Sequence, residues 1–170
     1  MTSTPLAFPV LAFAPDVGRH AMPGRERLDY FLDEEGFSTC TSWDLEYGSR
    51  QGMLLADCAG RCWRIVRVED LGVTRGFWER VLRFLLQQSV HRISQEIVEE
   101  PALSLVDLKE RVCASIAANP DDWRDDEVIA GEAGPPRDEQ ELLGELQAAV
   151  RKAETLPQLI NALYNEDLPG

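Results

Sequence analysis

Cysteine and histidine are the residue types in this chain that are best suited to binding a metal ion. Cys58 and Cys62 are separated by three residues and bracket a predicted turn, as the ligands of some zinc sites do. A structural zinc ion needs four ligands, usually as two close pairs, and the sequence has no second pair. We therefore expect no metal ion, and we expect Cys62 to lie in the core beside Trp63. The other cysteines and histidines are scattered along the chain: Cys40, Cys113, His20 and His91.

Nucleophilic catalysis would need His20 or His91 as its base, because these are the only histidines. His20 lies in residues 16–27, a predicted loop that contains glycine and proline. His91 falls in a segment of helical periodicity, where a histidine on the flank of a helix is the simpler interpretation. Neither is accompanied by a Gly-x-Ser-x-Gly or cysteine motif. The sequence thus favours a protein that is not an enzyme, with a small enzyme or ligand-binding domain that uses residues 16–27 as the alternative.

An acidic run in the C-terminal half could in principle hold Ca²⁺ or Mg²⁺. It lacks the alternating ligands, central glycine and closing glutamate of an EF-hand loop. A P-loop and a Gly-x-Gly-x-x-Gly motif are also absent from the sequence, so we expect no cofactor. An acidic surface that faces solvent or a partner explains the run better. Its members are Asp121, Asp122, Asp125, Asp126 and Glu127.

The formal net charge of −13 is concentrated in the C-terminal half. Residues 93–170 hold 18 acidic and 6 basic residues, whereas residues 1–92 hold 12 and 11. Such a field attracts basic proteins and repels nucleic acids and anionic membranes. The partner we expect is therefore a basic protein, with no binding of nucleic acid or membrane.

Aromatic side chains among these carboxylates are the expected anchors of an interface, because aromatic residues are enriched at binding hot spots. Trp123 lies within the acidic run, and Trp43 and Tyr47 share a short segment with Asp44 and Glu46. Packing of the same rings inside the fold is the alternative interpretation. We predict that the residues of the acidic run, with Trp123, Trp43, Asp44, Glu46 and Tyr47, contact the partner.

Strand-like sequence precedes helix-like sequence along the chain, an order typical of α+β proteins. Residues 6–13, 52–56 and 62–68 are predicted strands, with a turn at residues 57–60. Ser38 or Thr39 should cap a short helix that ends at Gly48. Apolar residues at three- and four-residue steps then predict a long amphipathic helix over residues 76–99.

Three further helices are predicted in the C-terminal half. Ser104 and Asp107 have the spacing of a capping box, which opens a helix through Ala118. Residues 138–153 form the next helix, and Thr155 caps the last, over residues 156–164. The predicted fold is a small, mostly antiparallel sheet packed on the long helix, with a C-terminal helical layer. We expect one domain, residues 1–170, β-rich to about residue 75 and helical from about residue 76.

The sequence predicts a cytoplasmic location. No stretch approaches the ~20 apolar residues that are needed to span a bilayer. The apolar residues 6–14 are interrupted by Pro9 and follow no basic residue, unlike a secretory signal. The cysteines are accordingly expected to be reduced.

The stretch from Ser38 to Trp43, followed by residues 53–61 and the alternating strand after them, resembles small bacterial proteins similar to the immunity proteins of polymorphic or contact-dependent toxins. The resemblance covers about residues 6–75. It implies a non-catalytic protein that binds and neutralises a toxin, and it assigns no functional residue. An adaptor subunit of a larger assembly is a further alternative.

Overall fold

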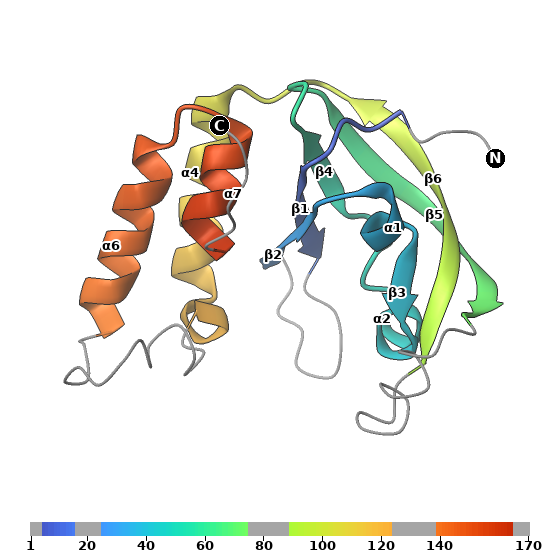
Figure 1. The fold of residues 1–170 in the computed structure, drawn as a ribbon. Coiled ribbons are helices and arrows are strands. Elements are labelled where there is room, and N and C mark those ends of the chain that lie inside the picture. Colours follow the sequence, from blue (N-terminus) through green and yellow to red (C-terminus); the bar gives the residue numbers. More distant parts are fainter. Residues whose placement is uncertain (1–4, 16–24, 75–88, 124–138, 165–170) are drawn as a thin grey trace. The chain divides into compact units, whose positions relative to one another are not determined.

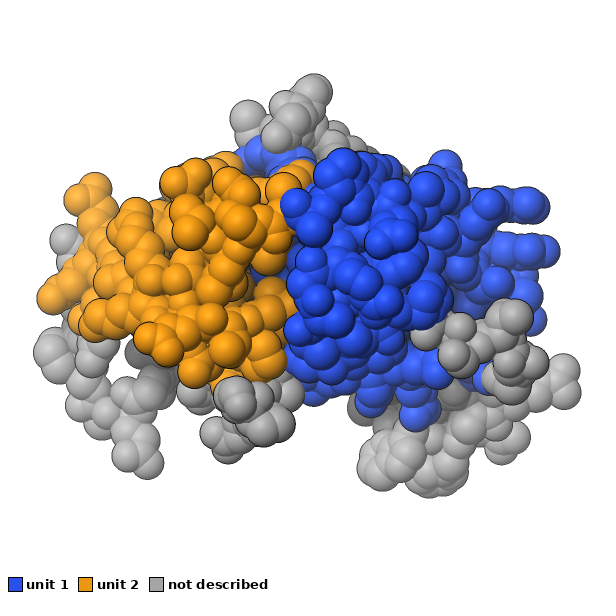
Figure 2. Space-filling view, turned by 90° about the horizontal axis from the view of Figure 1, so that it is seen from above, with its two compact units in different colours: residues 1–102 blue, residues 103–170 orange. Residues whose placement is uncertain are grey.

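The computed structural model describes residues 5–15, 25–74, 89–123 and 139–164. The chain divides into two compact units, residues 1–102 and residues 103–170, which Figure 2 colours separately. The first unit contains the sheet and two short helices, and the second contains helices alone in its described part. The β-rich part therefore continues well beyond residue 75, where the sequence analysis places its end.

The first unit is built on a six-stranded sheet with the order β2-β1-β4-β5-β6-β3, in which every pairing is antiparallel. The sheet curls into a half-barrel (Figure 1). This confirms the α+β class and the antiparallel sheet. The strands are β1 (Val10–Pro15), β2 (Glu26–Phe31), β3 (Thr39–Thr41), β4 (Leu54–Asp57), β5 (Cys62–Val73) and β6 (Val90–Glu100).

The prediction of a long helix over residues 76–99 is wrong in its second half, where β6 pairs with β5 along its whole length. Residues 75–88 lie outside the described residues. From Arg92 to Val98 the even-numbered positions of β6 are exposed, whereas the odd-numbered positions from His91 to Ile97 are less exposed and face the concave side of the sheet. Two of those inward positions, His91 and Gln95, are polar, so the sequence does not show the alternation of apolar and polar residues that is typical of a strand. The remaining apolar residues, Ile93 and Ile97, are four positions apart, which is the spacing of a helix face. The β-branched content of the segment is the strand signal that was overlooked.

The core of the first unit fills the concave face of the sheet. Alternate residues of β1, β4 and β5 point into it, as the period of two in a strand requires. Phe37, at the end of the short helix α1 (Glu34–Phe37), packs edge-on against Phe31 of β2 with ring centroids 5.4 Å apart. The buried members of this core are Leu6, Val10, Ala12, Ala14, Phe31, Phe37, Met53, Leu55, Trp63 and Ile65.

Arg50 connects the two edge strands of the sheet, β2 and β3. Its guanidinium donates hydrogen bonds to the carbonyl oxygens of Phe37, at 3.4 Å, and Thr39, at 2.8 Å. The same group lies 4.4 Å from the ring centroid of Phe31. Only 9% of Arg50 is exposed, and the carboxylate of Asp29 on β2 is its largest favourable charge interaction. Arg50 thus satisfies backbone groups near the open edge of β3, which protects that edge from pairing with another chain.

Asp57 organises the predicted turn between β4 and β5. Its carboxylate is buried and accepts hydrogen bonds from the amides of Ala7, Ala59 and Arg61. The guanidinium of Arg61 and the indole of Trp63 also donate to it, at 3.0 and 3.2 Å. Gly60 completes the turn with a φ of 80°, which glycine adopts without steric cost.

The second unit confirms the three C-terminal helices predicted from the sequence. α4 (Leu105–Ala118) begins with the capping box of Ser104 and Asp107, and the amide of Gln158 in α7 (Leu156–Tyr164) donates to the hydroxyl of Thr155. Between them lie the short 3₁₀ helix η1 (Pro120–Trp123) and α6 (Glu139–Lys152). Lys109 donates from α4 to the carbonyl of Arg151 at 3.0 Å. The fully buried apolar residues of the unit are Val112, Ile116, Val150, Leu159 and Ile160.

A search of the described residues finds no helix with the length and apolar character to cross a membrane.

Candidate functional site

The short helix α2 (Ser42–Tyr47) carries the most exposed of the predicted anchors. Its N-cap is Thr41, whose hydroxyl accepts from the amide of Asp44 at 3.2 Å, and Gly48 ends it in the left-handed conformation with φ 64°. The predicted stop at Gly48 is confirmed. The predicted cap at Ser38 or Thr39 is wrong, because residues 39–41 pair with β6 before the helix can begin.

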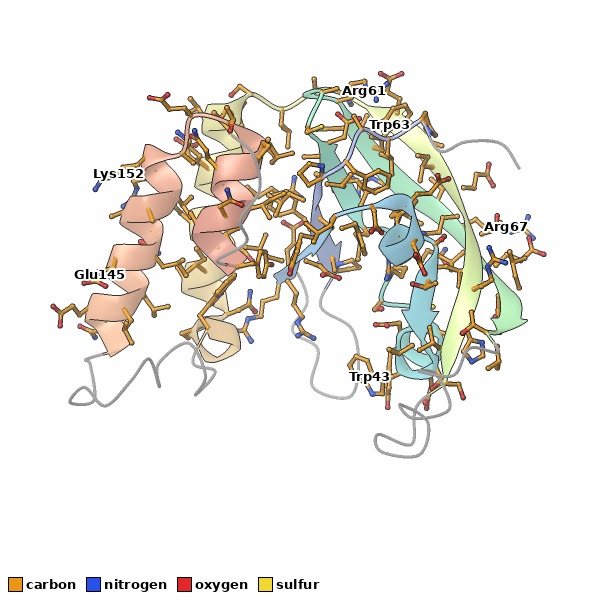
Figure 3. The ribbon with its side chains drawn as sticks, in the orientation of Figure 1. Trp43, Arg61, Trp63, Arg67, Glu145 and Lys152 are labelled. Atoms are coloured by element: carbon orange, nitrogen blue, oxygen red, sulfur yellow. The ribbon has the colours of Figure 1, made fainter. Side chains whose placement is uncertain are left out.

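Trp43 projects outward from α2 (Figure 3), and 42% of the residue is exposed. Its ring lies 4.7 Å from that of Tyr47, one turn further along the helix, at an interplanar angle of 50°. Glu46, also on α2, is exposed. We call Trp43, Glu46 and Tyr47 the aromatic surface. An exposed indole that rests on a second ring loses little conformational entropy when a partner covers it.

Asp44, another predicted contact residue, supports α2 from within. One carboxylate oxygen accepts from the amide and hydroxyl of Thr41, at 3.0 and 2.8 Å, and the other accepts from the hydroxyl of Ser49 at 2.9 Å. Burial alone would raise the pKa of Asp44, but these hydrogen bonds and the charge of Arg50 lower it. Asp44 is therefore half-buried and ionised, and it fixes the helix that presents Trp43.

The second predicted anchor, Trp123, is packed differently. It is half-buried at the end of η1, with its ring centroid 5.8 Å from that of Tyr164 at the end of α7. Asp121 and Asp122 belong to η1. Asp125, Asp126 and Glu127 lie outside the described residues. The structure thus brings Trp123 together with Tyr164 inside the second unit, and it places the aromatic surface in the first.

His91 is not on a helix, as the sequence suggested, but on β6, where it faces Cys40 across the β3–β6 pairing. Its Nδ1 lies 3.0 Å from both carboxylate oxygens of Asp70 on β5. The amide of Gly72 and the ring of His91 together hold the pKa of Asp70 below its usual value. His91 and Asp70 therefore form a pair at one end of the β5–β6 ribbon, and Cys40 lies opposite His91 on the neighbouring strand β3.

This cluster does not have the properties of a thiol enzyme. Only 5% of Cys40 is exposed, and burial raises the pKa of its thiol to about 11, so the sulfur is protonated at neutral pH. No hydrogen bond within the described residues joins that sulfur to His91. A nucleophilic cysteine needs an accessible thiolate with its base in hydrogen-bond reach. The second histidine, His20, lies outside the described residues.

The two cysteines that the sequence suggests as zinc ligands, Cys58 and Cys62, lie in different environments. Cys58 is exposed and its thiol donates to the carbonyl of Phe8 at 3.0 Å, whereas Cys62 is buried at the start of β5. No group of three or more potential metal ligands comes together among the described residues.

Comparisons with known proteins add no identity. No family model, curated protein or solved structure matches this chain. The resemblance to toxin immunity proteins therefore stays a prediction.

Two of the polar groups described above were missed in the sequence. Arg50 follows Gly48 and Ser49 in a polar stretch that predicts a solvated loop. Its side chain is buried because it lies against Phe31 of β2 and reaches the carbonyl oxygen of Thr39 on β3. The Asp70–His91 pair joins residues 21 positions apart, and of the two only His91 lies in the segment for which the sequence predicts a helix. The contact follows from the pairing of β5 with β6, because that pairing places the end of β5 beside the beginning of β6.

Proposed function

We propose that this protein is a non-catalytic protein-binding protein and that its main contact is the aromatic surface of α2. The observation that carries the proposal is the exposure of Trp43 on a helix fixed at both ends. A large apolar ring that stays accessible while its support is rigid is typical of an interface anchor. Its position beside Tyr47 adds contact area without adding flexible side chains.

Charge indicates the class of partner. The second unit, residues 103–170, holds 15 acidic and 6 basic residues, and the whole chain carries −13. Charges spread over such a surface accelerate the encounter with a protein of opposite sign, while a buried ring slows its release. We therefore propose a basic protein as the partner, with the predicted contacts at Trp123 and its neighbouring carboxylates as a secondary region.

The narrower proposal is an immunity protein that acts in the cytoplasm. Toxins that cleave nucleic acids have basic clefts, and an acidic inhibitor offers such a cleft the charge of its substrate. The four free cysteines agree with a reducing compartment. The sequence resemblance supports the same proposal, although the alternatives of an adaptor subunit and of a ligand-binding domain at residues 16–27 predict different partners.

Binding can be tested with the neighbouring genes as the source of candidates. A toxin encoded immediately upstream should form a complex with the purified chain and should lose its toxicity when the two are co-expressed. Trp43→Ala should weaken the complex by at least tenfold, as the loss of a hot-spot residue does. Leu71→Ala removes a side chain that is 62% exposed on β5 and serves as the matched control.

Salt provides the second measurement. Association should slow as ionic strength rises, because exposed charges are screened beyond about 10 Å at 0.1 M. Reversing Asp122, Asp125 and Asp126 to Lys should lower the association rate at a given salt concentration. The dissociation rate of the complex should stay unchanged, because it depends on the contacts of Trp43. If the association and dissociation rates do not change with salt, with the triple reversal or with Trp43→Ala, the partner is not a basic protein and the aromatic surface is not its contact.

A further inference from the structure

We infer that the aromatic surface receives an arginine side chain of the partner, with the guanidinium stacked on the indole of Trp43 and paired with the carboxylate of Glu46. The inference rests on the proposed function and names the group that the surface recognises. It follows from three properties of α2: the open ring, the local charge and the position of the nearest basic residue.

The open ring is the first property. Tyr47 lies against the Trp43 ring, and 42% of Trp43 remains exposed. The face of an indole carries negative potential, and it is the best of the aromatic faces for binding a cation. A planar guanidinium can lie flat on it, as a compact ammonium cannot.

The charge of the segment that carries this ring is the second property. Residues 41–49 contain two carboxylates, Asp44 and Glu46, and no lysine or arginine. Asp44 is occupied by Thr41 and Ser49, so it adds negative potential but has few free acceptor positions. Glu46 is exposed on the same helix, where its carboxylate can accept the forked hydrogen bonds of a guanidinium.

The nearest basic residue along the chain is the third property, because a neighbouring arginine could occupy the ring itself. Arg50 follows α2 by three residues, but its guanidinium is buried against Phe31 and bonded to the carbonyl oxygens of Phe37 and Thr39. It is therefore committed to the interior of the first unit. A cation from outside the chain does not have to displace it.

Peptides that differ in one functional group test the inference. The probe is acetyl-Gly-Arg-Gly-Arg-Gly-amide, and the controls replace both arginines by citrulline, which is neutral and of the same shape, by lysine or by norleucine. The readout is the indole N–H signal of Trp43 in a ¹H–¹⁵N spectrum at constant ionic strength, identified by its loss in Trp43→Phe. The signal of Trp63, whose indole donates to Asp57, reports that the fold is intact.

The arginine peptide should shift the Trp43 signal, and the citrulline and norleucine peptides should leave it in place. The slope of the shift with lysine should be about two- to fivefold lower, because an ammonium neither lies flat on the ring nor forms the forked hydrogen bonds of a guanidinium. Glu46→Gln should reduce the slope for arginine, whereas Glu69→Gln, an exposed carboxylate on β5, should not change it.

Two results would overturn the inference. Equal shifts with norleucine and arginine would show an apolar surface without preference for a cation. The absence of any Trp43 shift with the arginine peptide would show that the ring does not take this group. Neither result affects the proposed function, which is tested separately by the response of the protein complex to salt, to the triple reversal and to Trp43→Ala.

Discussion

Trp43 and Trp123 both stand among acidic residues in the sequence, yet the structure uses them differently. Trp43 lies on a capped helix with much of its ring exposed, and its neighbour Tyr47 supports it from one side. Trp123 is half-buried against Tyr164, which ties η1 to the end of α7. An aromatic residue flanked by carboxylates is thus not by itself an interface anchor. What separates the two is whether a second element of the same unit covers the ring.

The largest effect expected in this comparison comes from Arg50, which supports the region next to α2. Arg50→Met should lower the free energy of unfolding by about 3 kcal/mol, because the carbonyl oxygens of Phe37 and Thr39 lose their donor and Asp29 loses its largest favourable charge interaction. Burial already raises the pKa of Asp29, which reflects the cost of that charge. Urea denaturation measures the change. Arg67→Met, which removes an arginine that projects outward from β5 (Figure 3), should stay within about 0.5 kcal/mol of the wild type.

Asp57 should give the next largest effect, and the effect should depend on pH. Burial would raise the pKa of this carboxyl, but hydrogen bonds from Arg61, Trp63 and Ala7 lower it. A carboxylate with a lowered pKa stabilises the fold above its ordinary pKa, and this contribution disappears as the pH falls through the folded-state pKa. Asp57→Asn should therefore cost about 2 kcal/mol at neutral pH and progressively less below about pH 4.

Unfolding curves at neutral and acid pH provide the measurement. The difference between wild type and Asp57→Asn should shrink on acidification, while Glu69→Gln should show almost no difference at either pH. A constant difference across this range would mean that Asp57 contributes through its shape and not through its charge.

The contrast between the two tryptophans predicts stability effects of different size. Trp123→Ala should cost about 1–2 kcal/mol, roughly half the value for a fully buried tryptophan, because its contact with Tyr164 is lost. Trp43→Ala should cost less, about 0.5–1 kcal/mol, because it loses the ring contact with Tyr47 but little other buried area, while it weakens partner binding. Thermal unfolding of both variants decides the matter. Equal costs would remove the distinction between the two rings.

The sequence predicts correctly the features that depend on neighbouring residues. It does not predict features that depend on residues distant in the sequence. The capping box at Ser104 and the stop at Gly48 depend on residues within one or two turns, and both are confirmed. The strand β6 was missed because its inward positions include His91 and Gln95, which are tolerated only in the presence of Asp70 and the carbonyl of Phe37. Those partners come from other strands and elements, so no window of the sequence contains them.

The site could be predicted from the sequence only in part, again because some of its contacts join residues that are distant in the sequence. The acidic and aromatic composition of α2 is visible in the sequence, but the occupation of Asp44 by Thr41 and Ser49 is a matter of cap geometry. The burial of Arg50 depends on the approach of β2 to β3, strands that are not adjacent in the sheet order. Long-range closure of the sheet therefore decided which charged residues remain available to a partner.

A further effect concerns the cap that holds Trp43 in place. Thr41→Ala removes the hydroxyl that accepts from the amide of Asp44 and donates to its carboxylate, so it should cost about 1 kcal/mol. Ser104→Ala removes the equivalent cap of α4 and should cost a similar amount, which makes the two variants a matched pair for stability.

The two cap variants should differ in their affinity for the partner. If the rigidity of α2 contributes to recognition, Thr41→Ala weakens the partner complex and Ser104→Ala does not, because only the first loosens the helix that carries Trp43. Isothermal titration of both variants with the same partner separates the outcomes, and equal affinities would show that Trp43 binds without help from its helix.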